Sequence, residues 1–95
     1  MRTNIKQQFI NRLLETKEPF SATFQDRRIS LNQSERITFE RVGIDWYANI
    51  ERTHTLLCVG KYTANSVHLY RHIAGCKLSV IIPLSQLLHI QPIQQ

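Results

Sequence analysis

The chain has 95 residues, of which 42% are apolar, with only three glycines and three prolines. This composition predicts one globular domain with one modest core and excludes a disordered chain. No apolar run approaches the roughly 20 residues of a membrane-spanning helix, and polar residues interrupt the segment where a signal peptide would lie, so we expect a cytoplasmic protein. Lysine and arginine number 12 against 7 acidic residues, a formal charge of +5 that suits a polyanionic partner.

The first predicted element is a helix over residues 4–17. Asn4 is a suitable N-cap, and Gln7 stands three residues later, where a capping box places its second member. Pro19 excludes helical geometry for the residue before it and therefore ends the helix. One face of this helix collects apolar side chains, namely Ile5, Phe9, Ile10, Leu13 and Leu14.

After Pro19 the spacing of apolar residues changes from 3.6 to 2, which predicts strands. Half-buried strands are predicted where apolar and polar residues alternate, at 20–24, 29–31, 37–39, 46–50 and 78–82. Residues 56–59 are apolar throughout and predict a strand that is buried on both faces.

Two segments near the C-terminal end have no clear strand pattern. Residues 66–74 fit either a helix capped by Asn65 or a strand that has Val67, Leu69 and Ile73 on one face. Residues 84–95 are expected to form a loose tail, with at most one helical turn at its start. One helix followed by five or six short strands predicts a small β-barrel, because a closed sheet leaves few free edges.

Cysteine and histidine residues raise the question of a metal or catalytic site. Cys58, His68, His72 and Cys76 have suitable side chains for zinc, but a structural zinc site usually has close ligand pairs at both ends, and only one end qualifies here. A cysteine–histidine pair for nucleophilic catalysis has no local signature in this sequence. We therefore expect no metal, no cofactor and no enzyme activity, but surface histidines and two buried structural thiols.

Basic and aromatic residues adjoin one another in two places. Trp46 precedes Tyr47, and Tyr70 precedes Arg71 and His72. Aromatic rings stack on unpaired bases and cations hold phosphates, so such clusters are typical of proteins that bind single-stranded RNA. We expect Trp46 in the core and Tyr47, which would point the opposite way, at the surface.

Taken in order, these segments resemble the bacterial Sm-like RNA chaperone Hfq. Residues 5–20 are similar to the family's N-terminal helix, which ends at a proline before the first strand. Residues 43–51 resemble its strand Gly-Ile-Lys-Leu-Gln-Gly-Gln-Ile-Glu, and residues 56–59 take the place of its apolar third strand. Residues 70–73, Tyr-Arg-His-Ile, resemble the signature Tyr-Lys-His-Ala, and residues 79–83 resemble the following Thr-Val-Val-Pro strand.

The resemblance implies a mostly β fold, an Sm-like (SH3-type) small barrel in one domain over residues 1–95. Its N-terminal helix would be followed by a bent five-stranded antiparallel sheet over residues 20–83. Relative to the family, a hairpin around residues 27–42 would be inserted. In the family, the strand after the signature pairs with a neighbouring subunit, so the resemblance also implies a ring, expected to be a homohexamer.

The function that the resemblance implies is binding of single-stranded RNA, a small RNA or an mRNA, by an RNA chaperone in post-transcriptional regulation. Arg71 would contact phosphate, His72 a base or phosphate, and Tyr70 would support a turn. The other implied RNA-binding positions are Lys6, Gln7, Gln8, Thr55, Leu56 and Lys61.

Two departures from the family weaken the usual RNA contacts. Leu56 stands where the family has an aromatic residue that stacks on uridine. Leu14, Glu15 and Lys17 stand where the family has an arginine-rich patch on the helix. Both losses favour the alternative function, a barrel of the same kind that acts as a protein-interaction module.

Overall fold

The computed structural model describes residues 4–25 and 34–93. Its helix, α1 (Ile5–Glu15), begins as predicted, because the Asn4 side chain accepts a hydrogen bond of 2.8 Å from the backbone N–H of Gln7. The helix is shorter than predicted at its end, since Thr16 is already extended. Among the described residues, no helix has the length and apolar character needed to cross a membrane.

Seven strands follow in the described part of the chain, and together they form one antiparallel sheet. They are β1 (Phe20–Gln25), β2 (Ser34–Val42), β3 (Asp45–Ile50), β4 (Thr55–Tyr62), β5 (Ser66–Ile73), β6 (Cys76–Pro83) and β7 (Leu87–Pro92). Their order across the sheet is β6-β5-β4-β3-β2-β1-β7. The mostly β fold after an N-terminal helix was predicted correctly, but the five-stranded sheet was wrong.

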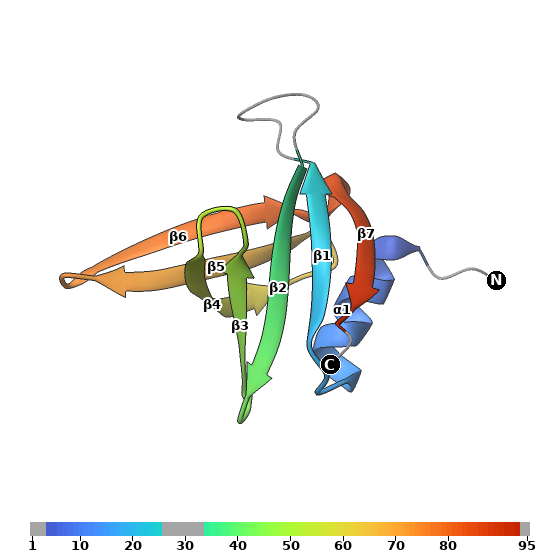
Figure 1. Ribbon diagram of the computed structural model, residues 1–95, viewed down its shortest axis with the longest axis horizontal. Helices are drawn as coiled ribbons and strands as arrows, with labels where there is room; N and C mark the ends of the chain where they lie inside the picture. Colours follow the sequence, from blue (N-terminus) through green and yellow to red (C-terminus); the bar gives the residue numbers. More distant parts are fainter. Residues whose placement is uncertain (1–3, 26–33, 94–95) are drawn as a thin grey trace.

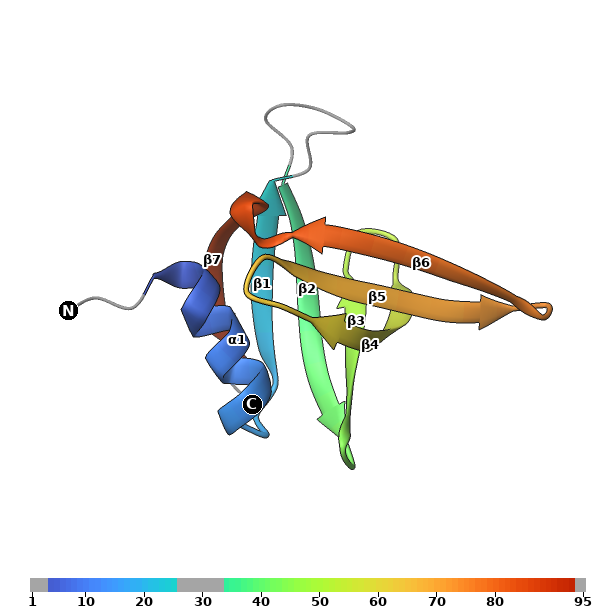
Figure 2. The same ribbon diagram turned by 180° about the vertical axis from the view of Figure 1, so that it is seen from behind.

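The sheet is bent and open, so the predicted closed barrel is also wrong. β1, β2 and β3 run side by side, whereas β5 and β6 cross them steeply and extend past them as a long hairpin (Figures 1 and 2). The two edges of the sheet are β6 and β7, which do not pair with each other. A short 3-10 helix, η1 (Leu84–Gln86), separates these strands and carries the chain from one edge to the other.

Residues 34–42 and 87–92 are both strands of the sheet. Residues 34–42, the described part of the segment that was expected to be an inserted hairpin, are β2, an interior strand between β1 and β3. The strand predicted at 29–31 lies outside the described residues. The expected loose tail of residues 84–95 is wrong over its described part, because β7 pairs with β1 and buries Leu87.

Aromatic residues from α1 and the first three strands make the centre of the core. The Phe9 ring meets the Phe39 ring edge to face, with centroids 5.2 Å apart, and Phe20 stacks on Phe39 at 5.1 Å. Trp46 is a core residue, as predicted, and its indole N–H donates a 3.0 Å hydrogen bond to the backbone carbonyl of Leu13. That carbonyl is one of the last four in α1, which have no partner within the helix.

The ambiguous segment 66–74 is a strand. β5 and β6 are joined by a two-residue turn at Ala74 and Gly75, whose φ angles are 51° and 82°, so both residues adopt the left-handed conformation of a type I′ hairpin. The prediction that residues 56–59 are buried on both faces is wrong, since only Leu57 of these residues is buried. Leu56 is exposed because the face of β4 that carries it is uncovered.

Candidate nucleic-acid interface

β4, β5 and β6 present two different faces. Ladder partners in an antiparallel pair point to the same side of a sheet, so the register assigns each residue to a face. Val67, Leu69 and Ile82 point into the core. The opposite side, which we call the outer face, carries Leu56, Cys58, Lys61, His68, Tyr70, His72, Lys77, Ser79 and Ile81.

Tyr70 lies at the centre of the outer face. It pairs with Cys58 on one side and Ser79 on the other, and Cys58 pairs in turn with Tyr47 of β3. The register between β4 and β5 shifts around Gly60, and a Cβ atom at Gly60 would lie 3.0 Å from Cδ1 and Cε1 of Tyr70. The phenol ring therefore rests directly on the backbone of β4, at a place where no side chain intervenes.

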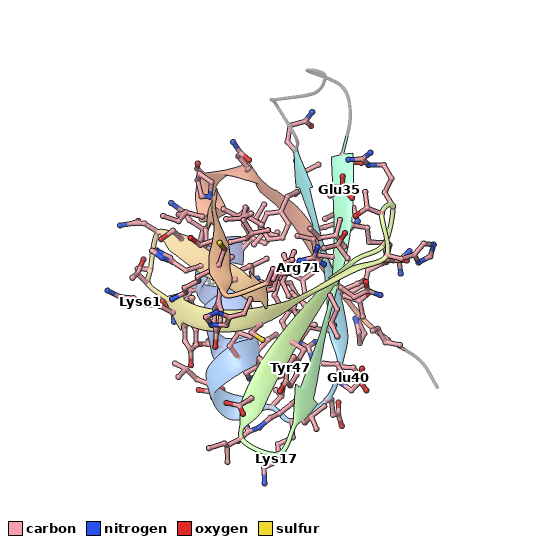
Figure 3. The ribbon with its side chains drawn as sticks, turned by 90° about the vertical axis from the view of Figure 1, so that its left-hand side faces the viewer. Lys17, Glu35, Glu40, Tyr47, Lys61 and Arg71 are labelled. Atoms are coloured by element: carbon pink, nitrogen blue, oxygen red, sulfur yellow. The ribbon has the colours of Figure 1, made fainter. Side chains whose placement is uncertain are left out.

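Cationic and ionisable side chains surround this ring. The Lys77 Nζ atom lies 4.8 Å from the Tyr70 ring centroid, within the range of a cation–π interaction. The His72 ring meets the Tyr70 ring nearly at right angles, with centroids 5.8 Å apart. Lys61 and His68 are ladder partners on the same face, nearer the β4–β5 turn. In Figure 3 Lys61 extends away from the sheet, while Lys17 lies at the lower end of the molecule.

Charge is segregated along the chain in a way that favours an anionic ligand here. All seven acidic residues lie at or before Glu51, so β4, β5 and β6 contain no carboxylate. On the neighbouring half of the sheet, Glu51 is held by Arg36 at 2.9 Å and by the Thr38 hydroxyl at 3.3 Å. The outer face therefore combines a positioned aromatic ring with cations that no acidic residue on its own strands neutralises.

The structure brings together only part of the predicted RNA-binding set. Leu56, Lys61, Tyr70 and His72 share the outer face. Arg71 is the ladder partner of Leu78 and points to the opposite side, because successive residues of a strand alternate. Arg71 and His72, which were both expected to contact RNA, therefore lie on opposite faces of β5.

Thr55 and Tyr70 also belong to the predicted set, and the structure places both of them within strands. Thr55 is the ladder partner of Ile50 and lies on the side of β4 that faces the core, opposite to Leu56. Tyr70 does not support a turn, because it lies within β5 and the turn at Ala74 begins only after Ile73.

The helix start lies beside the turn between β4 and β5. Lys6 and Gln7 line a surface hollow of about 200 Å³ together with Ala64 and Asn65. Gln8 lines a different hollow, along the side of the helix. The Gln7 backbone N–H is already occupied by Asn4, so the helix start offers fewer free N–H groups to an anion than expected.

The cysteines differ from the expectation of two buried thiols. Cys58 is only half-buried, and Cys76 is exposed at the hairpin end. Over residues 4–25 and 34–93 no three His, Cys, Asp or Glu side chains are grouped as metal ligands would be.

Sequence reasoning did not identify Gly60, His68 or Lys77 as members of this site. Their relation to Tyr70 depends on the register of β4, β5 and β6, which the sequence pattern alone does not give. The absence of acidic residues after Glu51 was the available signal for a cation-rich region. No family model matches the chain, and no curated protein or solved structure matches it either.

Proposed function

We propose that the outer face of β4, β5 and β6 binds single-stranded RNA. The observation that carries this proposal is the Tyr70 ring, which rests on the Gly60 backbone with Lys77 at 4.8 Å and His72 beside it. A base can stack on such a ring when the Lys77 ammonium moves from the ring face to a neighbouring phosphate, and Lys61 can bind a second phosphate. No carboxylate lies on these strands, which favours the approach of an RNA backbone.

The proposal includes assembly into an Sm-like ring, as the resemblance to Hfq implies, with a role in post-transcriptional regulation. β6 is an edge strand with a free row of backbone groups, which a second subunit can pair with. The outer face lies directly beside this edge, so a ring would place several copies of Tyr70 along one curved strand of RNA. Binding at several copies would raise the overall affinity above that of one subunit.

A second candidate function is binding of another protein through the same hairpin. Leu78 is 51% exposed and Ile81 is 58% exposed, and both lie on the edge strand β6, which pairs with β5 on one side only. An exposed apolar edge strand of this kind pairs readily with an extended peptide. This function would use the edge of β6 and would not require Tyr70.

The test is fluorescence anisotropy with labelled U-rich and A-rich RNA oligonucleotides and their DNA counterparts, at several salt concentrations. Tyr70→Leu should weaken RNA binding by about 1–3 kcal/mol, because it removes one stacking surface. Lys77→Ala should weaken binding to all sequences and reduce the salt dependence by about 0.7 in log–log slope, the value of one phosphate contact. Lys17→Ala removes an exposed cation from the segment between α1 and β1, outside the strands of the outer face, and is the matched control.

The outcomes separate the two functions. RNA binding that Tyr70→Leu and Lys77→Ala leave unchanged would contradict the proposed interface. If the native protein binds no RNA but captures an extended peptide through β6, the protein-binding function is the better account. DNA bound as tightly as RNA would make the protein a general single-strand binder.

A further inference from the structure

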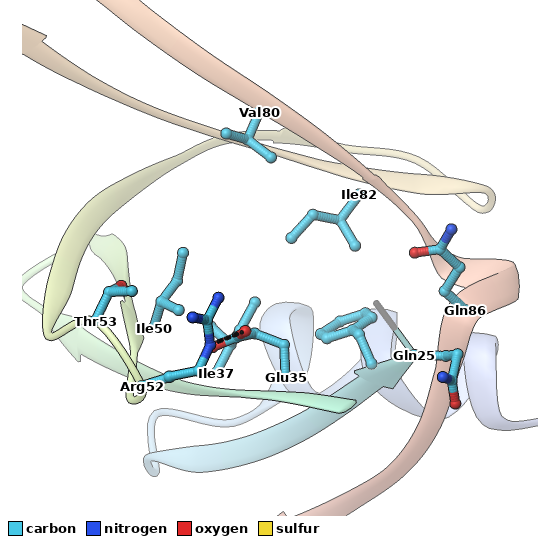
Figure 4. A pocket seen from close by; sticks show the side chains of 10 residues that line it. Gln25, Glu35, Ile37, Ile50, Arg52, Thr53, Val80, Ile82 and Gln86 are labelled. Atoms are coloured by element: carbon cyan, nitrogen blue, oxygen red, sulfur yellow. Dashed lines mark hydrogen bonds and ion pairs between the residues drawn. The ribbon is translucent and has the colours of Figure 1, made fainter. Parts of the chain in front are cut away.

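A cavity lies on the other side of β6, away from the outer face. It has a volume of about 320 Å³ and lies between β6 and the inner faces of β2 and β3 (Figure 4). Its walls are mostly apolar and come from Phe24, Ile37, Ile50, Val80 and Ile82. Its size is at the lower end of the range for small-molecule sites, about 300–1,000 Å³.

The polar part of this cavity is unusual, because Glu35 is a carboxylate with only 9% of its surface exposed. Arg52 holds one of its oxygens, with Nε 3.0 Å from Oε2 (Figure 4). The other oxygen, Oε1, is buried and has no hydrogen-bond donor among the described residues. A buried acceptor without a donor is costly, so such an atom indicates a missing partner.

We infer that this cavity binds a small, neutral, largely apolar molecule that carries one N–H or O–H donor. The apolar walls would hold its body, and its donor would satisfy Glu35 Oε1. A neutral ligand fits better than a cation, because Arg52 already offsets the charge of Glu35. A planar heterocycle with a ring N–H is the simplest molecule with these properties.

This site is independent of the proposed RNA interface. Along β6, Val80 and Ile82 line the cavity, whereas Ser79 and Ile81 point to the outer face. Tyr70, Lys77 and Lys61 line no part of the cavity. Loss of RNA binding would therefore not affect the inference, and loss of ligand binding would not affect the RNA proposal.

The experiment compares two probes of the same bicyclic shape, indole and benzofuran, by isothermal titration calorimetry and by amide chemical-shift changes. Indole has a ring N–H, whereas benzofuran has a ring oxygen and no donor. Indole should bind more tightly by at least about tenfold, the value of one hydrogen bond to a charged group. Shifted amides should include those of residues 35, 50 and 80.

Two variants test the role of the carboxylate. In Glu35→Gln the side-chain oxygen can accept from Arg52 while its NH₂ group faces the cavity, so the preference for indole should disappear. Glu40→Gln changes an exposed glutamate on the same strand, outside the cavity, and should leave the preference unchanged.

Equal binding of the two probes to the native protein, or binding of neither, would overturn the inference. That comparison uses the unmodified chain, so it remains decisive even if Glu35→Gln fails to fold. Indole binding that persists with the same preference in Glu35→Gln would place the ligand somewhere other than Glu35, and this too would overturn the inference.

Discussion

At position 60 a methyl group added to the backbone would lie 3.0 Å from two ring carbons of Tyr70. The backbone of Gly60 is outside the left-handed region that favours glycine, so an alanine there meets only the steric demand of the ring. We expect Gly60→Ala to fold but to displace the Tyr70 ring from the backbone of β4. RNA affinity measured by anisotropy should fall by up to about 1–3 kcal/mol, as for loss of a stacking surface.

A double-mutant cycle tests whether this effect passes through Tyr70. In a Tyr70→Leu background, Gly60→Ala should have little further effect on RNA affinity, because the ring that it displaces is gone. An equal loss of affinity in both backgrounds would mean that Gly60 acts in some other way.

Trp46 links the helix to the sheet through one hydrogen bond, from its indole N–H to the Leu13 carbonyl at 3.0 Å. Trp46→Phe keeps an aromatic ring but leaves that buried carbonyl without its donor. We expect the free energy of unfolding, measured by urea denaturation, to fall by about 1–3 kcal/mol. Tyr47→Phe changes the next residue, on the other side of β3, and should cost much less; similar losses would contradict the role given to the Trp46 hydrogen bond.

Element by element, local signals predicted the start of the helix and the strands β1 and β3. The Asn4 cap, the end of the helix before Pro19 and the alternation in β1 and β3 are all set by neighbouring residues. β7 could not be found this way, because its stability comes from pairing with β1, far away in the chain. The register shift between Thr23 and Phe24 also breaks the regular alternation that would have identified β7.

The candidate site also has a part that is set by neighbouring residues and a part that depends on strand pairing, and only the first part was predictable. The proximity of Tyr70 and His72 follows from their spacing in a strand, and the opposite direction of Arg71 follows as soon as the segment is known to be β5. The place of Lys77 over Tyr70 depends on the tight turn at Ala74 and Gly75, which fixes the register of the hairpin.

β7 itself offers a matched pair of substitutions. Leu87 is 7% exposed and lies in the core, whereas the adjacent Leu88 is 48% exposed. Leu87→Ala should lower the free energy of unfolding by about 2–5 kcal/mol, the usual cost of a buried leucine. Leu88→Ala should change it by no more than about 0.5 kcal/mol. Urea denaturation checks both values, and a loose tail would instead give small changes for both.

For the whole molecule, the open sheet places its free edge next to its cation-rich surface. β6 forms one edge, and its neighbour β5 carries Tyr70 and His72. An open edge with exposed Leu78 and Ile81 invites association, whereas β7, at the other edge, lies against α1 (Figure 1). Assembly through β6 would therefore join the outer faces of successive subunits, and this arrangement makes oligomerisation and RNA binding testable together.

A proline at position 79 can block such assembly without disturbing the chain's own sheet. In a hairpin with a two-residue turn, the pair that flanks the turn, Ile73–Cys76, is hydrogen-bonded. Hydrogen-bonded and non-hydrogen-bonded pairs alternate along an antiparallel ladder, so Tyr70–Ser79 is a non-hydrogen-bonded pair and the N–H of Ser79 points away from β5. Proline is tolerated on an edge strand when its missing N–H would have faced outward. By light scattering, the native protein and the control Ser79→Ala should both have a mass near six subunits. Ser79→Pro should be a folded monomer, and its RNA binding should be weaker. A native protein that is monomeric at micromolar concentration would contradict the ring, while a multimer that Ser79→Pro leaves intact would show that the subunits associate through a surface other than β6.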